Sequence, residues 1–320
     1  MSTRKEFLKE AAILGAGALI MPNSVFSKQN LTPKGMPEKL KILITGAGTG
    51  FGLESALKLA SLGHHVIASV EIPSQVNHLK QLAKEKNVKM QVEKLNIADP
   101  TEHAKAWGWD IDVLINNAGI AEGGSMVDIP MEHLRKQYEV NVFGPIGFTQ
   151  GFAKKMINKK KGKIIFISSV AGLTTDPFTG AYSSSKHAVE AFAEALNSEL
   201  QEFGVQIATI NPGPFFTGFN DRMFETWRDW DKATAQNVFD YSKINFPHEQ
   251  FVINEVIDKI VGVSTGVITK YRNVVPEKQT AMYQQQMAAV WQREQNPTTT
   301  GTKHELVKKA YQMRPETMAK

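Results

Sequence analysis

The 320 residues contain no cysteine and no apolar run long enough to cross a bilayer. Without cysteine the chain has no disulfide, no thiolate zinc site and no thiol nucleophile. The apolar stretch at the N-terminus runs only from Ala11 to Met21, whereas a spanning helix needs roughly 17 to 25 residues. The eight histidines are scattered, without the carboxylate spacing of a metal site. We therefore expect neither a membrane span nor a bound metal.

The chain also lacks any large concentration of charge. Lysine and arginine exceed aspartate and glutamate by 37 to 32, a net charge of +5, and the charged residues are dispersed apart from Lys159–Lys161. We interpret that run as a solvated loop, so nucleic acid is not an expected partner. With 42% hydrophobic and 22% charged residues, the composition is that of an ordinary globular protein that buries a full core.

The N-terminus has the order of an export signal. Three basic residues within the first nine precede the short apolar core, and small residues follow, with cleavage expected after Ser27. The run Thr3–Lys9 resembles the bacterial twin-arginine signal, with lysine in place of the second arginine. We expect residues 1–27 to direct the protein to the periplasm. The alternative is a first amphipathic helix of a cytoplasmic protein.

Strand-like apolar runs alternate with longer helical patterns from Leu40 onward. The expected strands are Leu40–Ile44, Val66–Val70, Lys89–Leu95, Val113–Ile115, Lys163–Ile167 and Val205–Ile210. The expected helices are Leu53–Leu62, Gln75–Glu85, Met131–Ile157 and Ala181–Phe203. This alternation predicts a single-domain α/β fold, a Rossmann-type doubly wound parallel sheet in three α/β/α layers.

We place that domain at residues 40–275. A polar, proline-bearing linker at 28–39 precedes it, and a helical extension at 276–320 follows it. Within the extension, Gln279–Gln292 is expected to be an amphipathic helix, and a polar loop leads to a last short helix.

Glycines cluster between the first expected strand and the first expected helix, in the segment Thr45-Gly46-Ala47-Gly48-Thr49-Gly50-Phe51-Gly52. Glycine lets the backbone turn sharply and approach a pyrophosphate, whose charge then lies at the helix N-terminus. Glycine-rich turns also occur for packing alone, but the position after the first strand favours a dinucleotide.

The same spacing, T-G-x-x-x-G-x-G, resembles that of the short-chain dehydrogenase/reductase family. Asn116-Asn117-Ala118-Gly119, at the end of the fourth strand, is similar to that family's N-N-A-G motif. Pro212-Gly213 followed by Thr217 is similar to its P-G-x-x-x-T segment, which runs past the nicotinamide. The resemblance covers about residues 40 to 275 and implies binding of a nicotinamide dinucleotide.

Tyr182 and Lys186 are four residues apart, which places them one turn apart on one face of a helix. A neighbouring cation stabilises a phenolate, so Lys186 is expected to lower the pKa of Tyr182 enough for acid/base work. The pattern Tyr-x-x-x-Lys also occurs by chance, so the assignment depends on the position of this pair in the chain.

Ser169 and Asn141 complete the set that the resemblance implies. Ser169 ends the fifth strand thirteen residues before Tyr182, and its hydroxyl can hydrogen-bond the reacting oxygen. Ser168 is the alternative, expected instead to bond to the backbone. Asn141 matches the asparagine that holds a water linked to the lysine. The family's mechanism is hydride transfer between a carbinol carbon and the nicotinamide, with Tyr182 as acid or base and Lys186 also holding the nicotinamide ribose.

Cofactor choice is expected to depend on the end of the second strand. The usual aspartate position is Val70, with Glu71 directly after it, and no lysine or arginine lies in the glycine loop or in Glu71–Ser74. Because a carboxylate binds ribose hydroxyls and repels a 2′-phosphate, we expect NAD rather than NADP. The cofactor-binding residues expected from these motifs are Thr45, Gly46, Gly48, Thr49, Gly50, Phe51, Gly52, Glu71, Asn96, Asn117, Ala118, Gly119, Tyr182, Lys186, Pro212, Gly213 and Thr217.

The substrate region is expected at residues 214–246, the lid of the resembled family. It is rich in aromatic residues, namely Phe215, Phe216, Phe219, Phe224, Trp227, Trp230, Phe239 and Tyr241. They indicate a bulky, apolar alcohol or ketone, or simply pack the lid on the domain. Further expected walls are Ala121–Met126 and Thr174–Phe178. The resemblance also implies a homodimer or homotetramer formed through the two long helices.

Two other functions remain open from the sequence. Sugar-nucleotide epimerases and dehydratases share the Tyr-x-x-x-Lys pattern, although their loop spacing differs. A nucleotide-binding sensor without catalysis would keep the fold and the glycine loop.

Overall fold

The computed structural model describes residues 39–230, 237–295 and 301–313. The expected export signal and almost all of the expected linker lie outside these residues. Within the described ranges, no helix combines the length and the apolar content that a membrane crossing requires.

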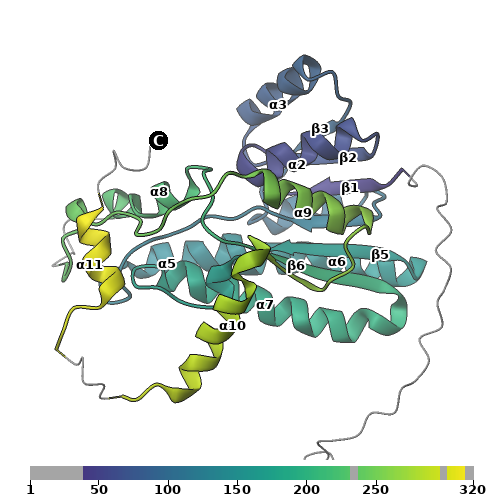
Figure 1. The fold of residues 1–320 in the computed structure, drawn as a ribbon. Helices are drawn as coiled ribbons and strands as arrows, with labels where there is room; N and C mark the ends of the chain where they lie inside the picture. The colour runs from purple at the N-terminus through teal and green to yellow at the C-terminus, as the bar shows by residue number, and fades with distance from the viewer. Residues whose placement is uncertain (1–38, 231–236, 296–300, 314–320) are drawn as a thin grey trace, which may run out of the picture. The chain divides into compact units, whose positions relative to one another are not determined.

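A seven-stranded parallel sheet forms the centre of the fold, in the order β3-β2-β1-β4-β5-β6-β7 (Figure 1). Its strands are β1 (Lys41–Ile44), β2 (His65–Val70), β3 (Gln91–Lys94), β4 (Val113–Asn116), β5 (Gly162–Ile167), β6 (Val205–Pro212) and β7 (Arg272–Val275). Six match expected strands. The seventh, β7, was missed because a four-residue edge strand that begins Arg-Asn carries almost no apolar pattern.

Helices cover both faces of the sheet (Figure 1). They include α2 (Gly50–Ser61), α3 (Pro73–Glu85), α5 (Met131–Tyr138), α6 (Gly144–Lys159), α7 (Gly180–Leu200) and α9 (Asn254–Thr265). Ile42 and Ile44 of β1 pack with α2, α3 and α9, whereas Leu43 between them packs with α6, α7 and the short α4 (Pro100–Ala106). This alternation of side chains is what a strand buried on both faces requires, and it confirms the three-layer fold.

The expected helix Met131–Ile157 is not continuous. A π-helical turn at Glu139–Phe143 separates α5 from α6. Pro145 has no N–H to donate to the carbonyl of Asn141, four residues earlier, so the α-helical ladder is interrupted at this point. Asn141 therefore lies in a π-turn rather than in the middle of a regular helix.

The expected lid folds around an apolar cluster of its own. It contains α8 (Phe219–Met223), and Phe224, Trp230 and Tyr241 are buried in a cluster that also takes in Phe178 from the loop before α7. The last helix, α11 (Glu305–Gln312), adds Val307 and Ala310 to the same cluster. The C-terminal extension thus supports the lid.

The other helix of the extension, α10 (Thr280–Ala289), is helical as expected but lacks a buried stripe. Only Tyr283 of its residues is buried, in a small cluster with Leu173 and Val274. The expected amphipathic face is therefore reduced to a single anchoring side chain.

Candidate active site

One cavity of about 410 Å³ brings together most of the residues singled out from the sequence. It lies at the carboxyl ends of the strands around β1 and β4, where the strand order reverses and where doubly wound sheets bind ligands. All the expected site residues line it except Gly52 and Asn141. Among the described residues, no group of three histidine, aspartate or glutamate side chains is arranged to hold a metal ion.

The glycine loop forms one wall of this cavity. Gly46 and Gly50 have φ values of +65° and +56°, which other residues rarely adopt. A Cβ on Gly46 would lie 2.7 Å from Cα of Ala118, so only glycine allows the two loops to approach this closely. Thr49 precedes α2 without a capping side-chain hydrogen bond, which leaves the N–H groups of the helix N-terminus for a ligand. A dinucleotide pyrophosphate fits this arrangement.

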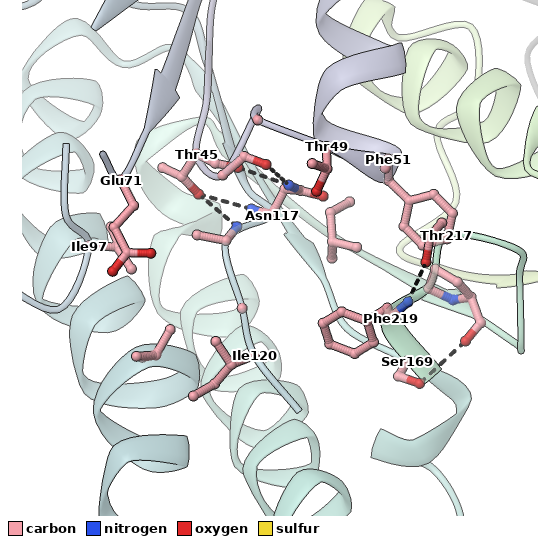
Figure 2. A pocket seen from close by; sticks show the side chains of 18 of the residues that line it. Thr45, Thr49, Phe51, Glu71, Ile97, Asn117, Ile120, Ser169, Thr217 and Phe219 are labelled. Carbon is pink, nitrogen blue, oxygen red and sulfur yellow. Dashed lines mark hydrogen bonds between the residues drawn. The ribbon is translucent and has the colours of Figure 1, made fainter. Parts of the chain in front are cut away.

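Thr45 and Asn117 lock the loop after β1 to the loop after β4 (Figure 2). The Thr45 hydroxyl accepts hydrogen bonds from the N–H groups of Asn117 at 3.0 Å and Ala118 at 3.1 Å. In return, Asn117 Nδ2 donates to the carbonyls of Thr45 at 2.9 Å and Gly46 at 3.0 Å. The two motifs therefore act as one structural unit beside the cavity.

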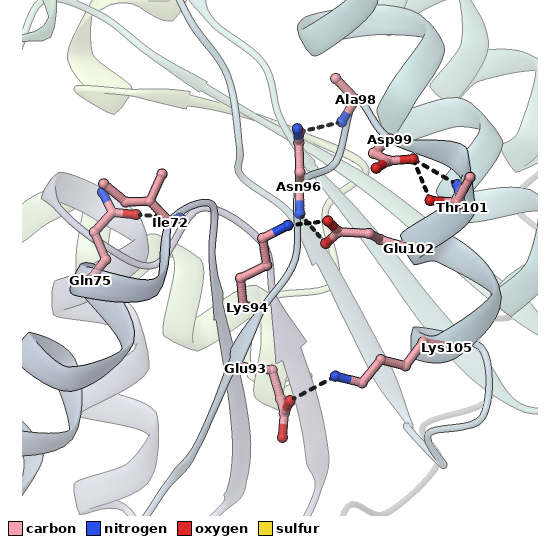
Figure 3. Close-up of polar contacts among 10 residues, drawn as sticks. All are labelled: Ile72, Gln75, Glu93, Lys94, Asn96, Ala98, Asp99, Thr101, Glu102 and Lys105. Carbon is pink, nitrogen blue, oxygen red and sulfur yellow. Dashed lines mark hydrogen bonds and ion pairs between the residues drawn. The ribbon is translucent and has the colours of Figure 1, made fainter.

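Glu71, Asn96 and Ile97 lie at one end of the same cavity, as Figure 2 shows for Glu71 and Ile97. Asn96 Oδ1 accepts a hydrogen bond from the Ala98 N–H at 3.0 Å, within its own turn (Figure 3). Gln75 also lines the cavity there, and its Oε1 accepts from the Ile72 N–H at 3.3 Å. We call this region the adenosine end.

Sequence reasoning missed several residues of the cavity. They are Gln75, Ile97, Ile120, Lys136, Val140, Asn220 and Arg222. Each lies outside the recognisable motifs and reaches the cavity only because a helix or loop turns it inward. The signal that could have identified Gln75 is its place in the first turn of the helix after β2.

Tyr182 and Lys186 of α7 form the core of the other end, which we call the reaction end. Lys186 Nζ lies 5.7 Å from the centroid of the Tyr182 ring and donates a hydrogen bond to the Ile167 carbonyl at 2.8 Å. Burial lowers the pKa of Lys186 to about 8, although the charge of Glu190 opposes this shift. Burial likewise raises the pKa of Tyr182 to about 12, against the influence of the Ser169 hydroxyl.

The expected depression of the Tyr182 pKa is therefore not present in the chain alone. Burial disfavours the phenolate more strongly than the polar surroundings favour it. The tyrosine is held protonated, ready to donate a proton to a bound oxygen.

Ser169 lies beside Tyr182 at the end of β5, and its hydroxyl is fixed in the site. It accepts a hydrogen bond from the Ala171 N–H at 3.0 Å and donates to the Pro212 carbonyl at 3.3 Å. Ser168, which we expected to bond to the backbone, has a buried hydroxyl without a partner among the described residues.

Asn141 lies behind the cavity wall as a brace. Its Oδ1 accepts from the Ile120 N–H at 2.8 Å, and its Nδ2 donates to the Ile120 carbonyl at 2.9 Å and to Ser185 Oγ at 3.1 Å. A Cβ on Gly119 would lie 3.2 Å from Asn141 Oδ1 and 3.8 Å from Lys186 Nζ. The π-turn thus joins the loop after β4 to the helix that carries Tyr182 and Lys186.

Few of the lid's aromatic residues reach the cavity. Phe215 and Phe219 line it, and the Phe219 ring meets the Tyr182 ring edge-on with centroids 5.6 Å apart. The expected walls at 121–126 and 174–178 do not line it. Ala121 and Phe178 pack in the lid cluster instead, so the packing interpretation holds for most of the lid.

The sequence matches the short chain dehydrogenase family over residues 40–228. An uncharacterized oxidoreductase of Bacillus subtilis, YusZ, is 41% identical over 189 residues, which is 57% of this chain and 67% of the relative. The 3-ketodihydrosphingosine reductase of Bacteroides thetaiotaomicron is 34% identical over 197 residues, 61% of this chain and 70% of the relative. The NADPH-dependent 3-dehydrocapnine reductase of Ornithobacterium rhinotracheale is 50% identical over a shorter stretch of 113 residues, 33% of this chain and 39% of the relative.

The fold is similar to solved structures as well. A short-chain dehydrogenase from Streptomyces avermitilis superimposes with a TM-score of 0.66 over 80% of this chain and 95% of its own, at 22% identity. At this identity the likeness concerns the fold alone, and it agrees with the strand order described above.

Proposed function

Since the chain belongs to the short-chain dehydrogenase/reductase family and is an NAD(P)-dependent oxidoreductase that interconverts an alcohol and a ketone, we propose a finer assignment. Its substrate is a bulky, largely apolar secondary alcohol or ketone, and its preferred cofactor is NAD. The observation that carries the reaction is the meeting of Ser169, Tyr182 and Lys186 with the glycine loop around one cavity.

The side chains of the reaction end divide the proton chemistry between them. When bound, the dinucleotide supplies or accepts the hydride. Tyr182 donates its proton to the ketone oxygen in reduction and accepts it in oxidation. The Ser169 hydroxyl turns its proton from the Pro212 carbonyl to the same oxygen and donates a hydrogen bond to it. The Lys186 ammonium offsets the negative charge on Tyr182 after the proton has left.

Glu71 supports the preference for NAD. Its carboxylate lines the adenosine end, where it can accept hydrogen bonds from ribose hydroxyls and repels a 2′-phosphate. Neither the glycine loop nor Glu71–Ser74 contains a cation to offset that repulsion. The relative whose name specifies NADPH makes this a sharp test: the ratio of kcat/KM for NADH to that for NADPH should exceed one.

Apolar side chains at the reaction end support the proposed substrate. Phe219 meets the Tyr182 ring, and Ile120 and Phe215 line the same cavity. Two relatives are named as reductases of a 3-keto and a 3-dehydro compound. Both features favour ketone reduction on a molecule with an apolar body.

A ketone panel tests the assignment. Purified protein is given NADH or NADPH with acetone, 2-octanone, acetophenone or a ketose, and absorbance of the reduced nicotinamide is followed. We expect 2-octanone or acetophenone to be reduced faster than acetone or the ketose. Equal rates throughout would contradict the apolar substrate. Dinucleotide binding without turnover on any ketone or alcohol would favour the sensor, and turnover of a sugar nucleotide would favour the epimerase.

Export and assembly are further parts of the proposal. The motif around Arg4 and Lys5 supports transport to the periplasm. Fractionation of cells that make wild type or Arg4→Ala/Lys5→Ala tests it, and an exclusively cytoplasmic wild type would contradict it. The family resemblance supports a homodimer or homotetramer, which light scattering on the purified protein measures.

A further inference from the structure

Three polar side chains behind the reaction end form a network that the mechanism above does not use. They are Glu190 of α7, Asn211 of β6 and Arg272 of β7. Glu190 Oε1 accepts a hydrogen bond from Asn211 Nδ2 at 2.6 Å, and its Oε2 accepts one from Arg272 Nη2 at 2.9 Å. The Glu190 side chain is only 8% exposed, against 34% for Arg272. A buried carboxylate is thus satisfied from two neighbouring strands.

Asn211 connects this network to Ser169. Its Nδ2 donates a second hydrogen bond, to the Ser169 carbonyl at 3.1 Å, and its Oδ1 accepts one from Thr209 Oγ1 at 3.2 Å. Asn211 is fully buried, so water does not compete for these bonds. The main chain of Ser169 is therefore held by a side chain that Glu190 holds in turn.

Glu190 also lies one helical turn beyond Lys186. Its negative charge favours the protonated lysine, against the burial that lowers the Lys186 pKa to about 8. The other titratable or charged groups that face this pair are Tyr182 on α7, Tyr271 just before β7, and Arg272 at the start of β7. Burial raises the pKa of Tyr271 to about 12, so it stays neutral near pH 8. Arg272 is the cation that forms an ion pair with Glu190.

We propose that Glu190 is a positioning residue for the reaction: through Asn211 it fixes Ser169, and through its charge it keeps Lys186 an ammonium. Arg272 moderates that charge through its ion pair with Glu190 Oε2. The inference rests on the hydride-transfer function proposed above and adds the residues that prepare two of its participants.

The two charged residues have opposite signs, so their removal has opposite effects. Glu190→Gln keeps the size of the side chain but removes the charge, so Lys186 should lose its proton at lower pH. Arg272→Gln leaves the charge of Glu190 without its counter-ion, so Lys186 should hold its proton to higher pH. We expect shifts of roughly 0.5 to 1 pH unit in each direction, from Coulomb interaction at these separations. The double variant should return close to wild type.

The first readout is the pH profile of kcat for alcohol oxidation, with NAD and the alcohol of the best ketone in the panel. The alkaline limb, above which Lys186 is uncharged, should move down for Glu190→Gln and up for Arg272→Gln. For Glu190→Gln we also expect kcat to fall several-fold with KM for NAD within about two-fold, because the network reaches Ser169 and not the dinucleotide loop. Glu194→Gln, the same substitution one turn further along α7 at an exposed position, should leave the profile unchanged.

A second readout needs no turnover. The ¹³Cε resonance of Lys186, assigned with a Lys186→Arg variant, is titrated in each protein and should shift as the kinetic limb does. Shifts in the same direction for both variants, or no shift in Arg272→Gln, would overturn the inference. Arg272 is partly exposed, so its variant decides the matter even where Glu190→Gln does not fold. If the wild type shows no turnover but the Lys186 pKa still shifts in opposite directions in the two variants, the proposed function is contradicted and the role of the network in setting the lysine's charge stands.

Discussion

The adenosine end and the reaction end of the cavity are built on different principles. The glycine loop and the adenosine end beside it are shaped mainly by main chain and by missing side chains, with Gly46 against Ala118 and Thr45 bonded to the Asn117 loop. The reaction end is shaped by ionisable side chains whose pKa values burial displaces, Tyr182 upward and Lys186 downward. Dinucleotide binding at the first should therefore weaken when a substitution adds atoms to a glycine. The chemistry at the second should weaken when a substitution removes a polar atom or changes a charge.

The largest effect is expected from removing one oxygen atom at the reaction end. Tyr182→Phe keeps the ring against Phe219 but leaves no proton to transfer, so kcat should fall about 10³-fold. NADH binding, measured by fluorescence titration, should stay within about two-fold. Tyr138→Phe, on α5 outside the cavity, is the matched control. Retention of a tenth of the activity in Tyr182→Phe would show that another group transfers the proton.

Adding one carbon atom should damage the dinucleotide loop in turn. A Cβ on Gly52 would lie 2.4 Å from the Gly46 carbonyl oxygen and 2.5 Å from Asn117 Nδ2, so Gly52→Ala must displace the loop. Overpacking of this kind costs about 1 to 3 kcal/mol, and we expect NADH to bind about 10- to 100-fold more weakly.

The control for that substitution is Gly147→Ala in α6. There the nearest atom, on His103, would be 3.7 Å from the new Cβ, and alanine favours a helix. Equal dissociation constants for NADH in the Gly52→Ala and Gly147→Ala variants would contradict the claim that close main-chain packing shapes the dinucleotide loop.

Reversing a charge at the adenosine end should have a smaller effect than the two substitutions above, because it changes which dinucleotide is preferred and not the hydride-transfer step. Glu71→Arg replaces a carboxylate that repels a 2′-phosphate by a cation that binds it. We expect the ratio of kcat/KM for NADPH to that for NADH to rise about ten-fold or more. Glu54→Arg on α2, outside this cavity, is the control. An unchanged ratio in Glu71→Arg would place the ribose elsewhere.

The smallest effect is expected at Gln75, a side chain in a region dominated by main chain. Its Nε2 lies 3.0 Å from the position of a Cβ on Gly48, and its Oε1 holds the Ile72 N–H. Gln75→Ala should raise KM for NAD about two- to five-fold, by the loss of about one hydrogen bond, with kcat unchanged. Gln81→Ala on the same helix removes an exposed bond to Glu85 and should change neither constant. A fall in kcat for Gln75→Ala would contradict this prediction, because it would show that the adenosine end also affects the hydride-transfer step.

Sequence reasoning recovered the fold wherever apolar runs were long. Six strands and the helices α2, α3, α5, α6 and α7 were recovered from the alternation of apolar runs and helical patterns. The exception among these strands is β3, Gln-Val-Glu-Lys, which buries only Val92 and is not an apolar run. Helix α9 was not among the expected helices although it is twelve residues long. The edge strand β7 and the short α4 were missed, since four to seven residues carry little periodic signal. The π-turn was missed although Pro145 is a signal for a break in a helix, because the helical pattern continues on both sides of it.

The site was predictable to the extent that its residues belong to local motifs. Tyr182, Lys186 and Ser169 line one cavity as their spacing implied. The direction of the Tyr182 pKa was not predictable, because burial depends on Phe219 and the lid cluster, far along the chain. The network of Glu190, Asn211 and Arg272 likewise joins three elements that no sequence window contains.

The π-turn at Glu139–Phe143 has a consequence for insertions and deletions. A turn of this kind holds one residue more than an α-helical turn, so deleting a residue there would rotate α5 about 100° relative to α6. Gln137, which bonds to the Ile120 carbonyl and the Glu122 N–H, would then face away from the loop that it anchors. Within these five residues, chain length is therefore constrained more tightly than the identity of an exposed side chain such as Phe143.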